Sequence, residues 1–483
     1  MGWFKSRTLK RPGLIWGIAG MALTFLILAQ ALISSGFQYE TSDLKKPIIT
    51  LVAMMVGAGI VYLFVIFALK EIPISKGLWI WIILCGLLFR LSMFQSTPML
   101  EDDHYRYLWD GGVLANGFNP YRYSPGAIHE AKPSQIPDTL RELAHQYGSD
   151  LERINYPWLR TIYPPLTQFG FALAHLISPW DIIGWRLVLL IFDVITLCLL
   201  FVLLRHLNLP MIGLVIYWWN PLLVKEIYNS GHMEVMLFPF ILGAMIFSIT
   251  GRYLWVSCAI GLAVGIKFWP AILLPLLLRP ILGQPKRCIA PLLCFAGLST
   301  AAFLPFYLTG LGPDSGFTAY GRYWEMNDAL FMVILRTVQF LSNLLSFHMV
   351  SPQTMTRVIV AALLLVFTLS VLGRGKYNPE TMPSRALFLV AALFILSPTQ
   401  FPWYYLWVLP LLAIRIQYAL LFLTALLPLY YMRFYFDIRG LAPVHDKGIV
   451  WLEFMPVWYL FAKAFIRAFG RRFSLVPSLK VDP

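Results

Sequence analysis

Hydrophobic stretches of about 20 residues recur along this chain from end to end, and they constrain its fold more than any other feature. A helix needs about 20 mostly apolar residues to cross the ~30 Å hydrocarbon core of a bilayer. Of the 483 residues, 59% are hydrophobic and 13% are charged, whereas soluble domains carry about 25% charged residues. The sequence therefore predicts an all-α polytopic membrane protein.

The expected spanning segments follow directly from these stretches. Several are short or interrupted by proline, so we expect about 12–14 transmembrane helices. The segments lie near residues 14–34, 48–69, 78–94, 184–206, 211–228, 233–250, 254–267, 268–282, 288–308, 354–373, 386–399, 403–414, 417–432 and 449–467.

The basic residues of the short loops indicate how these segments are oriented. With the N-terminus in the cytoplasm, the cytoplasmic loops receive most of the lysine and arginine residues, as the positive-inside rule requires. These residues are Lys70, Lys76, Arg205, Arg252, Arg279, Lys286, Arg287, Arg374, Lys376, Arg385 and Arg415. The net charge of +14 then has a topological origin and does not indicate a nucleic-acid partner. In this orientation, residues 95–183 and 309–353 form two long external loops.

Both external loops contain helical patterns. One helix face is indicated by the i, i+3, i+4, i+7, i+8 spacing of Tyr105, Leu108, Trp109, Gly112 and Val113. Because its apolar face carries Trp and Tyr, we expect this helix to lie in the headgroup plane of the membrane. The apolar stretches 166–178 and 328–347 are predicted to form further juxtamembrane helices on the same side.

Three consecutive acids, Glu101, Asp102 and Asp103, follow the spanning segment 78–94 at the point where the bilayer ends. One carboxylate there would serve as a helix N-cap and suit the helix dipole. Three in a row at a membrane surface fit better with activating a hydroxyl group or holding a cation. A carboxylate that takes a proton from a hydroxyl contributes roughly 10²–10⁴ in rate. The spacing alone does not separate a general base from a metal ligand.

A second charged motif, residues 229–234, joins two helices at their outer ends. It contains His232 and Glu234, and Lys225 and Glu226 come just before it. The His-Glu-x-x-His pattern of zinc proteases is absent from it. Either a structural role or a role in a substrate site therefore stays open for His232 and Glu234.

Lys267 is expected at the outer tip of two short helices. Its ammonium group either extends toward the lipid headgroups or pairs with a phosphate, whose charge must be stabilised when it leaves. Arg160, Tyr163 and Tyr404 are expected on the same side. They either contact phosphate or sugar or belong to the aromatic belt of the membrane interface.

Asp193 lies near the middle of the 184–206 segment. A carboxylate at that depth costs roughly 2.5–3.5 kcal/mol, so it is expected to face the bundle interior beside a partner. Arg186, earlier on a similar face, is the candidate partner. The five cysteines show neither a disulfide framework nor zinc spacing.

Four short motifs resemble those of the GT-C superfamily of integral membrane glycosyltransferases, specifically bacterial polyprenyl-phosphate-mannose-dependent mannosyltransferases. The first mannosyltransferase of GPI-anchor synthesis has a similar motif. The matching pieces are Glu101-Asp102-Asp103-x-Tyr105-x-x-x-x-Asp110, Gly117-x-Asn119-Pro120-Tyr121, Tyr163-Pro164-Pro165-Leu166 and Phe401-Pro402-Trp403-Tyr404-Tyr405. The resemblance implies a GT-C fold with external juxtamembrane helices. It also implies a catalytic domain over residues 78–467, extra N-terminal helices at 1–77 and a cytoplasmic tail at 468–483.

The resemblance also implies an activity. A hexose, which is mannose in these enzymes, would pass with inversion from a polyprenyl-phosphate donor to an acceptor hydroxyl on the non-cytoplasmic face. The family's general base aligns with Asp102 in one member and lies nearer Asp103 in another; we prefer Asp102. The remaining candidates for substrate contact are Glu101, Tyr105, Arg160, Tyr163, His232, Glu234, Lys267 and Tyr404.

Further expectations concern partners and location. Enzymes of this type commonly need no metal, and we expect neither a metal nor another cofactor. The acceptor is a glycan, a lipid or a protein, and the partners include membrane lipids. The protein is expected in a bacterial inner membrane with its active site on the periplasmic side.

Two other functions remain to be distinguished from a mannosyltransferase. A secondary transporter or lipid flippase would explain Asp193 and the broken helices, although no internal repeat of the kind many transporters carry is visible. A ligase or polymerase that uses a lipid-pyrophosphate glycan is the alternative enzyme. Competition between the two kinds of donor separates the enzymes.

Overall fold

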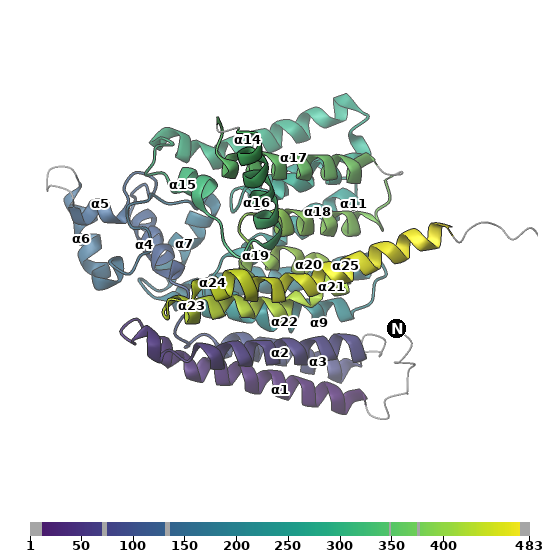
Figure 1. Ribbon diagram of the computed structural model, residues 1–483, viewed down its shortest axis with the longest axis horizontal. Helices are drawn as coiled ribbons and strands as arrows, with labels where there is room; N and C mark the ends of the chain where they lie inside the picture. The colour runs from purple at the N-terminus through teal and green to yellow at the C-terminus, as the bar shows by residue number, and fades with distance from the viewer. Residues whose placement is uncertain (1–11, 70–74, 131–135, 347–348, 374–376, 474–483) are drawn as a thin grey trace, which may run out of the picture.

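The computed structural model describes residues 12–69, 75–130, 136–346, 349–373 and 377–473, and these residues form helices joined by loops (Figure 1). Within these ranges, extended pairing is limited to two isolated bridges, Arg160 with Ser315 and Met326 with Thr399. The all-α fold expected from the sequence is confirmed. Lys70, Arg374, Lys376 and the end of the expected tail, residues 474–483, lie outside the described residues.

Several helices are long and apolar enough to cross a membrane, which confirms a multi-pass protein. By length and composition, the described residues contain six such spans, or seven if a bent pair counts as one. Five are single helices: α1 (Pro12–Ile33), α2 (Ile48–Leu69), α8 (Ile182–His206), α14 (Pro285–Thr309) and α17 (Pro352–Gly373). The sixth is the irregular run Tyr418–Asp437, which contains α21 (Tyr418–Leu421), α22 (Leu423–Leu426) and α23 (Met432–Asp437).

The other predicted segments are also helical. Most of them are shorter or broken, whereas α25 is 24 residues long and contains Pro456. The helices concerned are α3 (Lys76–Ser92), α9 (Ile212–Trp218), α10 (Pro221–Leu223), α11 (Phe238–Ile249), α12 (Tyr253–Val264), α13 (Leu274–Leu277), α18 (Met382–Leu396), α19 (Pro402–Tyr405), α20 (Leu409–Ile414) and α25 (Val450–Phe473). Proline, which cannot donate a backbone hydrogen bond inside a helix, stands at the start of several of them. These interruptions bring loops and polar groups into the bundle.

One interruption reverses the chain direction. The segments Ile212–Asn229 and Glu234–Ile249 meet at 109°. Before the bend, residues Val224–Asn229 form a π-helix, a feature that often marks functional sites. At the bend, Gly231 has a φ of +81°, the left-handed region that glycine enters without strain. The bend places His232 and Glu234 at the end of the bundle that faces the external helices.

The helices of the first predicted external loop form a small unit, the external unit, at one end of the molecule. It contains α4 (Asp103–Ala115), α5 (Pro125–Glu130), α6 (Asp138–Tyr147) and α7 (Pro165–Ile177). In Figure 1 this unit lies at the left, whereas the first turn of α1 and the last turn of α25 lie at the right. The α15 helix (Gly316–Tyr323) borders it, and α16 (Ala329–Leu344) follows within the second predicted loop.

The apolar face of α4 was expected to rest in the lipid headgroups, and this prediction is wrong. Leu108, Trp109 and Val113 are instead buried in a protein core with residues of α6, including Leu140 and Tyr147. The reason is that α6, α7 and the loops around them supply enough apolar surface to cover this face. The same amphipathic spacing fits a membrane surface and a small protein core equally well.

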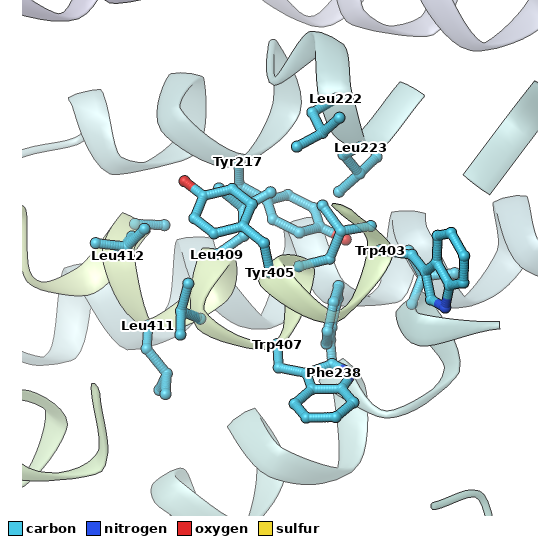
Figure 2. Packing of buried hydrophobic residues seen from close by; sticks show 14 of the residues in the cluster. Tyr217, Leu222, Leu223, Phe238, Trp403, Tyr405, Trp407, Leu409, Leu411 and Leu412 are labelled. Atoms are coloured by element: carbon cyan, nitrogen blue, oxygen red, sulfur yellow. The ribbon is translucent and has the colours of Figure 1, made fainter. Parts of the chain in front are cut away.

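The main hydrophobic core lies among the broken helices. Figure 2 shows part of it, where the buried side chains of Tyr217, Leu222 and Leu223 lie near the α19–α20 segment with Tyr405 and Leu409. This packing fixes the inner ends of the segments whose outer ends carry the polar residues described below.

The partner of Asp193 is not Arg186, so this expectation is corrected. Asp193 accepts a hydrogen bond of 2.6 Å from Nε of Arg90 on α3, and both side chains are fully buried. The hydroxyl groups of Tyr217 and Tyr228 also donate to it, at 2.5 and 2.6 Å. These contacts satisfy the carboxylate, and Asp193 does not border the large cavity. The pair therefore joins α3 to α8 as a structural contact.

Candidate active site

All ten site residues selected from the sequence border one cavity of about 870 Å³ between the external unit and the helix bundle. These residues are Glu101, Asp102, Asp103, Tyr105, Arg160, Tyr163, His232, Glu234, Lys267 and Tyr404. The volume lies in the range of cavities that hold small molecules or parts of larger ones. The structure thus gathers residues from widely separated parts of the chain around one space.

The loop that carries the three acids is anchored by two buried polar side chains. The guanidinium group of Arg186 donates to the carbonyl oxygens of Phe94 and Ser96, at 2.7 and 2.9 Å. Asn229 accepts a hydrogen bond of 2.9 Å from the backbone N–H of Met99. Leu100 follows with a φ of +67°, a strained value for a side chain with a Cβ. The acids are therefore held by contacts with the bundle.

Asp102 and Asp103 share one amide partner. Nδ2 of Asn155 lies 2.7 Å from Oδ1 of Asp102 and 3.2 Å from Oδ1 of Asp103. Asp102 occupies the N-cap position of α4, but its side chain makes no capping hydrogen bond. Oδ2 of Asp103 accepts a hydrogen bond of 3.2 Å from the hydroxyl group of Tyr107. Helix capping thus does not account for Asp102, whose carboxylate is open to the cavity.

The environment of the acids makes them more basic than ordinary carboxylates. Burial by the protein around the cavity, together with the negative charge of the neighbouring Asp103, raises the pKa of Asp102 to about 6. The side chain of Asp102 keeps exposed surface, and it lines the cavity. Burial also raises the pKa of Asp103 and of Glu101. A carboxylate with a pKa near 6 is still ionised at neutral pH and accepts a proton more readily than a free one.

His232 lies behind the acids. Its Nδ1 is 3.5 Å from the hydroxyl oxygen of Tyr107 and 4.0 Å from Oδ2 of Asp103. Its ring stacks on Trp403, with centroids 3.9 Å apart. Nε2 points toward Glu226, 3.7 Å from the nearer carboxylate oxygen. His232 therefore bridges the acidic triplet and a deeper polar cluster.

That deeper cluster consists of Lys225, Glu226 and Tyr431, all fully buried. The hydroxyl group of Tyr431 donates to both carboxylate oxygens of Glu226, at 2.8 and 3.0 Å. Nζ of Lys225 lies 3.5 Å from Glu226 and also contacts the Tyr431 hydroxyl. Buried charges inside a membrane bundle are costly unless paired, and these groups compensate one another.

Lys267 is a cation that also borders the cavity. Its ammonium group forms an ion pair with the fully buried carboxylate of Glu234. It also lies 4.5 Å from the ring centroid of Tyr404 and 5.5 Å from that of Trp407. The side chain of Lys267 is 18% exposed, toward the cavity. A phosphate group in the cavity would meet a positive charge already fixed in place.

The other candidates differ in what their side chains can still do. The guanidinium group of Arg160 is already bonded within the protein. It pairs with Asp314 at 2.8 Å and donates to the carbonyl oxygens of Thr309 and Gly310. It therefore anchors the start of the second external loop. Tyr163 packs edge-on against Tyr107, at 5.2 Å between centroids.

Tyr105 and Asp110, which belong to the motifs of the resemblance, form hydrogen bonds with other side chains of the protein. The Tyr105 hydroxyl accepts a long hydrogen bond of 3.4 Å from Arg153. Asp110 is buried inside α4 and accepts a hydrogen bond of 3.0 Å from Gln168 of α7. Asp110 thus fixes α4 against α7 rather than facing the cavity.

Sequence reasoning missed several residues that the site contains. Asn155 was not selected because it stands alone in a loop, and only the fold shows that it meets Asp102. Tyr107 was hidden in the helical pattern of α4. Tyr320, whose hydroxyl lies 2.8 Å from that of Tyr404, falls in a stretch without a charged motif. Among the described residues, no group of three or more His, Cys, Asp or Glu side chains is arranged to hold a metal ion.

The fold and the cavity define a membrane-embedded enzyme in which neighbouring carboxylates and a fixed cation border one ligand-sized space. Residues 14–281 match the model of the MptA_B family, described as alpha-(1->6)-mannopyranosyltransferase, N-terminal domain. The match covers more than half of the 483 residues, and the chain belongs to this family of GT-C-type mannosyltransferases. No curated relative and no solved structure matches it significantly. Membership in an enzyme family gives no support to the transporter alternative.

Proposed function

We propose that this mannosyltransferase takes mannose from a polyprenyl-phosphate-linked donor and transfers it to an acceptor hydroxyl, with Asp102 as general base. The observation that carries the proposal is the arrangement of the cavity. Two carboxylates with raised pKa values and an ammonium group border the same space. A transfer reaction with a phosphate leaving group needs both functions.

The proton and charge of the reaction have defined places in this arrangement. The acceptor hydroxyl gives its proton to the carboxylate of Asp102 as its oxygen forms a bond to the anomeric carbon of the donor. The bond between that carbon and the phosphate oxygen breaks, and the phosphate takes the bonding electrons. Lys267 stabilises the charge of the leaving phosphate, and Asn155 holds the carboxylate of Asp102 in position.

The proposed stereochemistry is inversion. Direct attack by the acceptor oxygen, with Asp102 as the base, comes from the face opposite the leaving phosphate and inverts the anomeric carbon. An alpha-linked product, as the family description states, then requires a beta-linked donor. A double displacement would instead place a carboxylate nucleophile opposite the phosphate and would keep the configuration of the donor.

The proposed location is the non-cytoplasmic face of a bacterial inner membrane. Three helices that contribute residues to the cavity, α4, α15 and α23, lie at the end of the molecule opposite the first turn of α1 and the last turn of α25 (Figure 1). The positive-inside rule supports the proposed orientation, because the loops predicted to be cytoplasmic carry most of the lysine and arginine residues.

The decisive experiment uses the full chain in liposomes with a polyprenyl-phosphate-mannose donor. We expect transfer of mannose, and Asp102→Asn should lower kcat by about 10²–10⁴ while donor binding is kept. Asp103→Asn is the matched variant and should lower kcat less. The reverse order of effects would assign the base to Asp103. Transfer from a lipid-pyrophosphate glycan in place of the phosphate donor would favour the ligase alternative.

A further inference from the structure

Three aromatic side chains border the outer part of the cavity. Tyr156 and Trp158 come from the loop between α6 and α7 and are 45% and 61% exposed. Trp324 is the residue that ends α15 and is partly exposed. The ring centroid of Tyr156 lies 5.6 Å from that of Trp158 and 4.7 Å from that of Trp324. We refer to these three side chains as the aromatic platform.

The aromatic platform is directly connected to the base. Asn155, which donates to Asp102 at 2.7 Å, immediately precedes Tyr156 in the chain. Because Tyr156 and Asp102 line the same cavity, a group on the Tyr156 ring shares this space with the carboxylate that would take the acceptor proton.

The other end of the aromatic platform continues toward the cation. Trp324 packs on Tyr320, at 5.7 Å between centroids. The Tyr320 hydroxyl meets that of Tyr404 at 2.8 Å, and Lys267 lies over the Tyr404 ring. The aromatic platform is thus connected both to the proposed base and to the cation, and all of these residues line the same cavity.

The backbone at Tyr156 is held in an unusual conformation. Its φ is +47°, a left-handed value that costs a residue with a Cβ roughly 1–2 kcal/mol. The carbonyl oxygen of Tyr156 accepts a hydrogen bond of 3.1 Å from the buried guanidinium group of Arg106. Strain of this kind persists where surrounding contacts impose it, and it gathers at binding sites. These contacts therefore hold Tyr156 in a fixed position on the loop.

An interfacial aromatic belt would explain exposed Trp and Tyr residues in another way. Belt residues lie on the lipid-facing surface of spanning helices, whereas these three residues lie on a loop and at the end of an eight-residue helix. They also line the same cavity as Asp102 and Asp103. A hexose has an apolar face of C–H groups and a rim of hydroxyl groups, which matches open aromatic rings beside carboxylates.

We propose that Tyr156, Trp158 and Trp324 bind the sugar units of an oligosaccharide acceptor that lie beyond the unit receiving mannose. The aromatic platform then makes the enzyme prefer acceptors of several sugars over a single sugar. This inference rests on the proposed function, because it assigns the acceptor side of the same cavity. Each added sugar that reaches a ring buries apolar surface and lowers the acceptor KM.

The test measures the acceptor KM as a function of chain length. The full chain in liposomes receives polyprenyl-phosphate-mannose and alpha-linked mannose acceptors of one, two and four units on the same aglycone. We expect the unaltered protein to show a lower KM for the longer acceptors. Trp158→Ala and Trp324→Ala should raise the KM for the four-unit acceptor about tenfold, equivalent to roughly 1.4 kcal/mol of binding. The KM values of the one-unit acceptor and of the donor should stay the same.

Two further variants make the result specific. Trp158→Phe keeps an aromatic ring and should restore most of the length preference. Tyr323→Ala removes a ring that is 69% exposed on the same α15 helix but does not line the cavity, and it should have no effect.

Three outcomes would overturn the inference. An active, unaltered protein with the same KM for every acceptor length has no sites for further sugars. A rise in KM that is equal for short and long acceptors in the tryptophan variants indicates a general structural effect. A change that depends on the lipid composition of the vesicles assigns the rings to the membrane interface. Absence of any transfer by the unaltered protein is distinguishable from these, since it overturns the proposed function and removes the basis of the inference.

Discussion

The side-chain amide of Asn155 lies 2.7 Å from the carboxylate of Asp102, although 53 residues separate them in the chain. An ionised carboxylate accepts this hydrogen bond better than a protonated one, so the contact lowers the pKa of Asp102. Burial acts in the opposite direction and is the larger effect, which leaves the pKa at about 6. Asn155 thus both orients the proposed base and limits how far its basicity rises.

The activity of the unaltered protein should depend on pH in a way set by Asp102. A general base must be ionised, so we expect kcat/KM to be constant near neutral pH and to fall as the pH drops through about 6. An acid limb near pH 4, the ordinary range of aspartate, would contradict this assignment.

Replacing Asn155 by alanine should move the acid limb to higher pH. The variant removes a hydrogen bond to the charged form of Asp102, which is worth roughly 1 kcal/mol in an open cavity, or somewhat less than one pH unit. The measurement is the pH profile of kcat/KM. Asn116→Ala is a suitable control, because Asn116 is exposed at the other end of α4 and bonds only within that helix. A shift of the acid limb to lower pH would contradict the role of Asn155.

Lys267 should be required for donor binding rather than for the fold alone. We expect Lys267→Met to raise the donor KM at least tenfold, since a hydrogen bond to a charged group is worth roughly 1.5–3 kcal/mol. The variant also leaves the buried Glu234 carboxylate without its partner, which lowers stability. The double variant Lys267→Met/Glu234→Gln separates the two effects. It should recover thermal stability while the donor KM stays high. Recovery of both would mean that Lys267 serves only Glu234.

The buried pair of Lys225 and Glu226 should be a stability determinant below the site. Lys225→Met leaves Glu226 charged and uncompensated, and breaking a buried pair in this way costs roughly 3–5 kcal/mol. We expect a lower midpoint of thermal unfolding in detergent, measured by circular dichroism. Lys225→Met/Glu226→Gln removes both charges and should lie closer to the unaltered protein. If the single and double variants are equally destabilised, charge compensation is not the reason for the pair.

The sequence predicted the helices better than it predicted the site. Long apolar runs such as Ile182–His206 need only their own composition to be placed, and α4 followed from the spacing of its apolar residues. The partner of the apolar face of α4 could not be predicted, because the same spacing of apolar residues suits a lipid surface and a protein core. The pairing of Asp193 with Arg90 joins residues 103 positions apart, and one sequence contains no signal for such a contact.

In the candidate site, too, some residues could be predicted from the sequence and others could not. The acids and Lys267 were selected because charges are rare and costly beside apolar segments, and they line one cavity. Arg160 was selected for the same reason, but it binds backbone carbonyl oxygens instead. Asn155 and Tyr107 are ordinary residues by type, and only the three-dimensional fold brings them to the carboxylates. The division of the chain at residue 77 stays a prediction. The connection between α1 and α2 nevertheless reaches the cavity through Phe37 and Tyr39.

The packing of α4 on α7 depends on a glycine and provides a test of the fold that does not involve catalysis. A Cβ atom added to Gly111 would lie 2.4 Å from the backbone carbonyl oxygen of Phe171. Backbone atoms cannot move aside as a flexible side chain can, so Gly111→Ala should force α4 away from α7 and destabilise the protein by roughly 1–3 kcal/mol.

Gly243→Ala in α11 is the matched control, because nothing lies within 4 Å of its Cβ position. Alanine favours a helix over glycine by up to about 1 kcal/mol, so the control should be unchanged or slightly more stable. Thermal unfolding of the two variants in the same detergent measures the difference. Since α4 begins at Asp103 and Asp102 is its N-cap residue, Gly111→Ala should also lower kcat, whereas Gly243→Ala should not. Equal stability of the two variants would show that α4 and α7 are not packed as closely as the structure indicates.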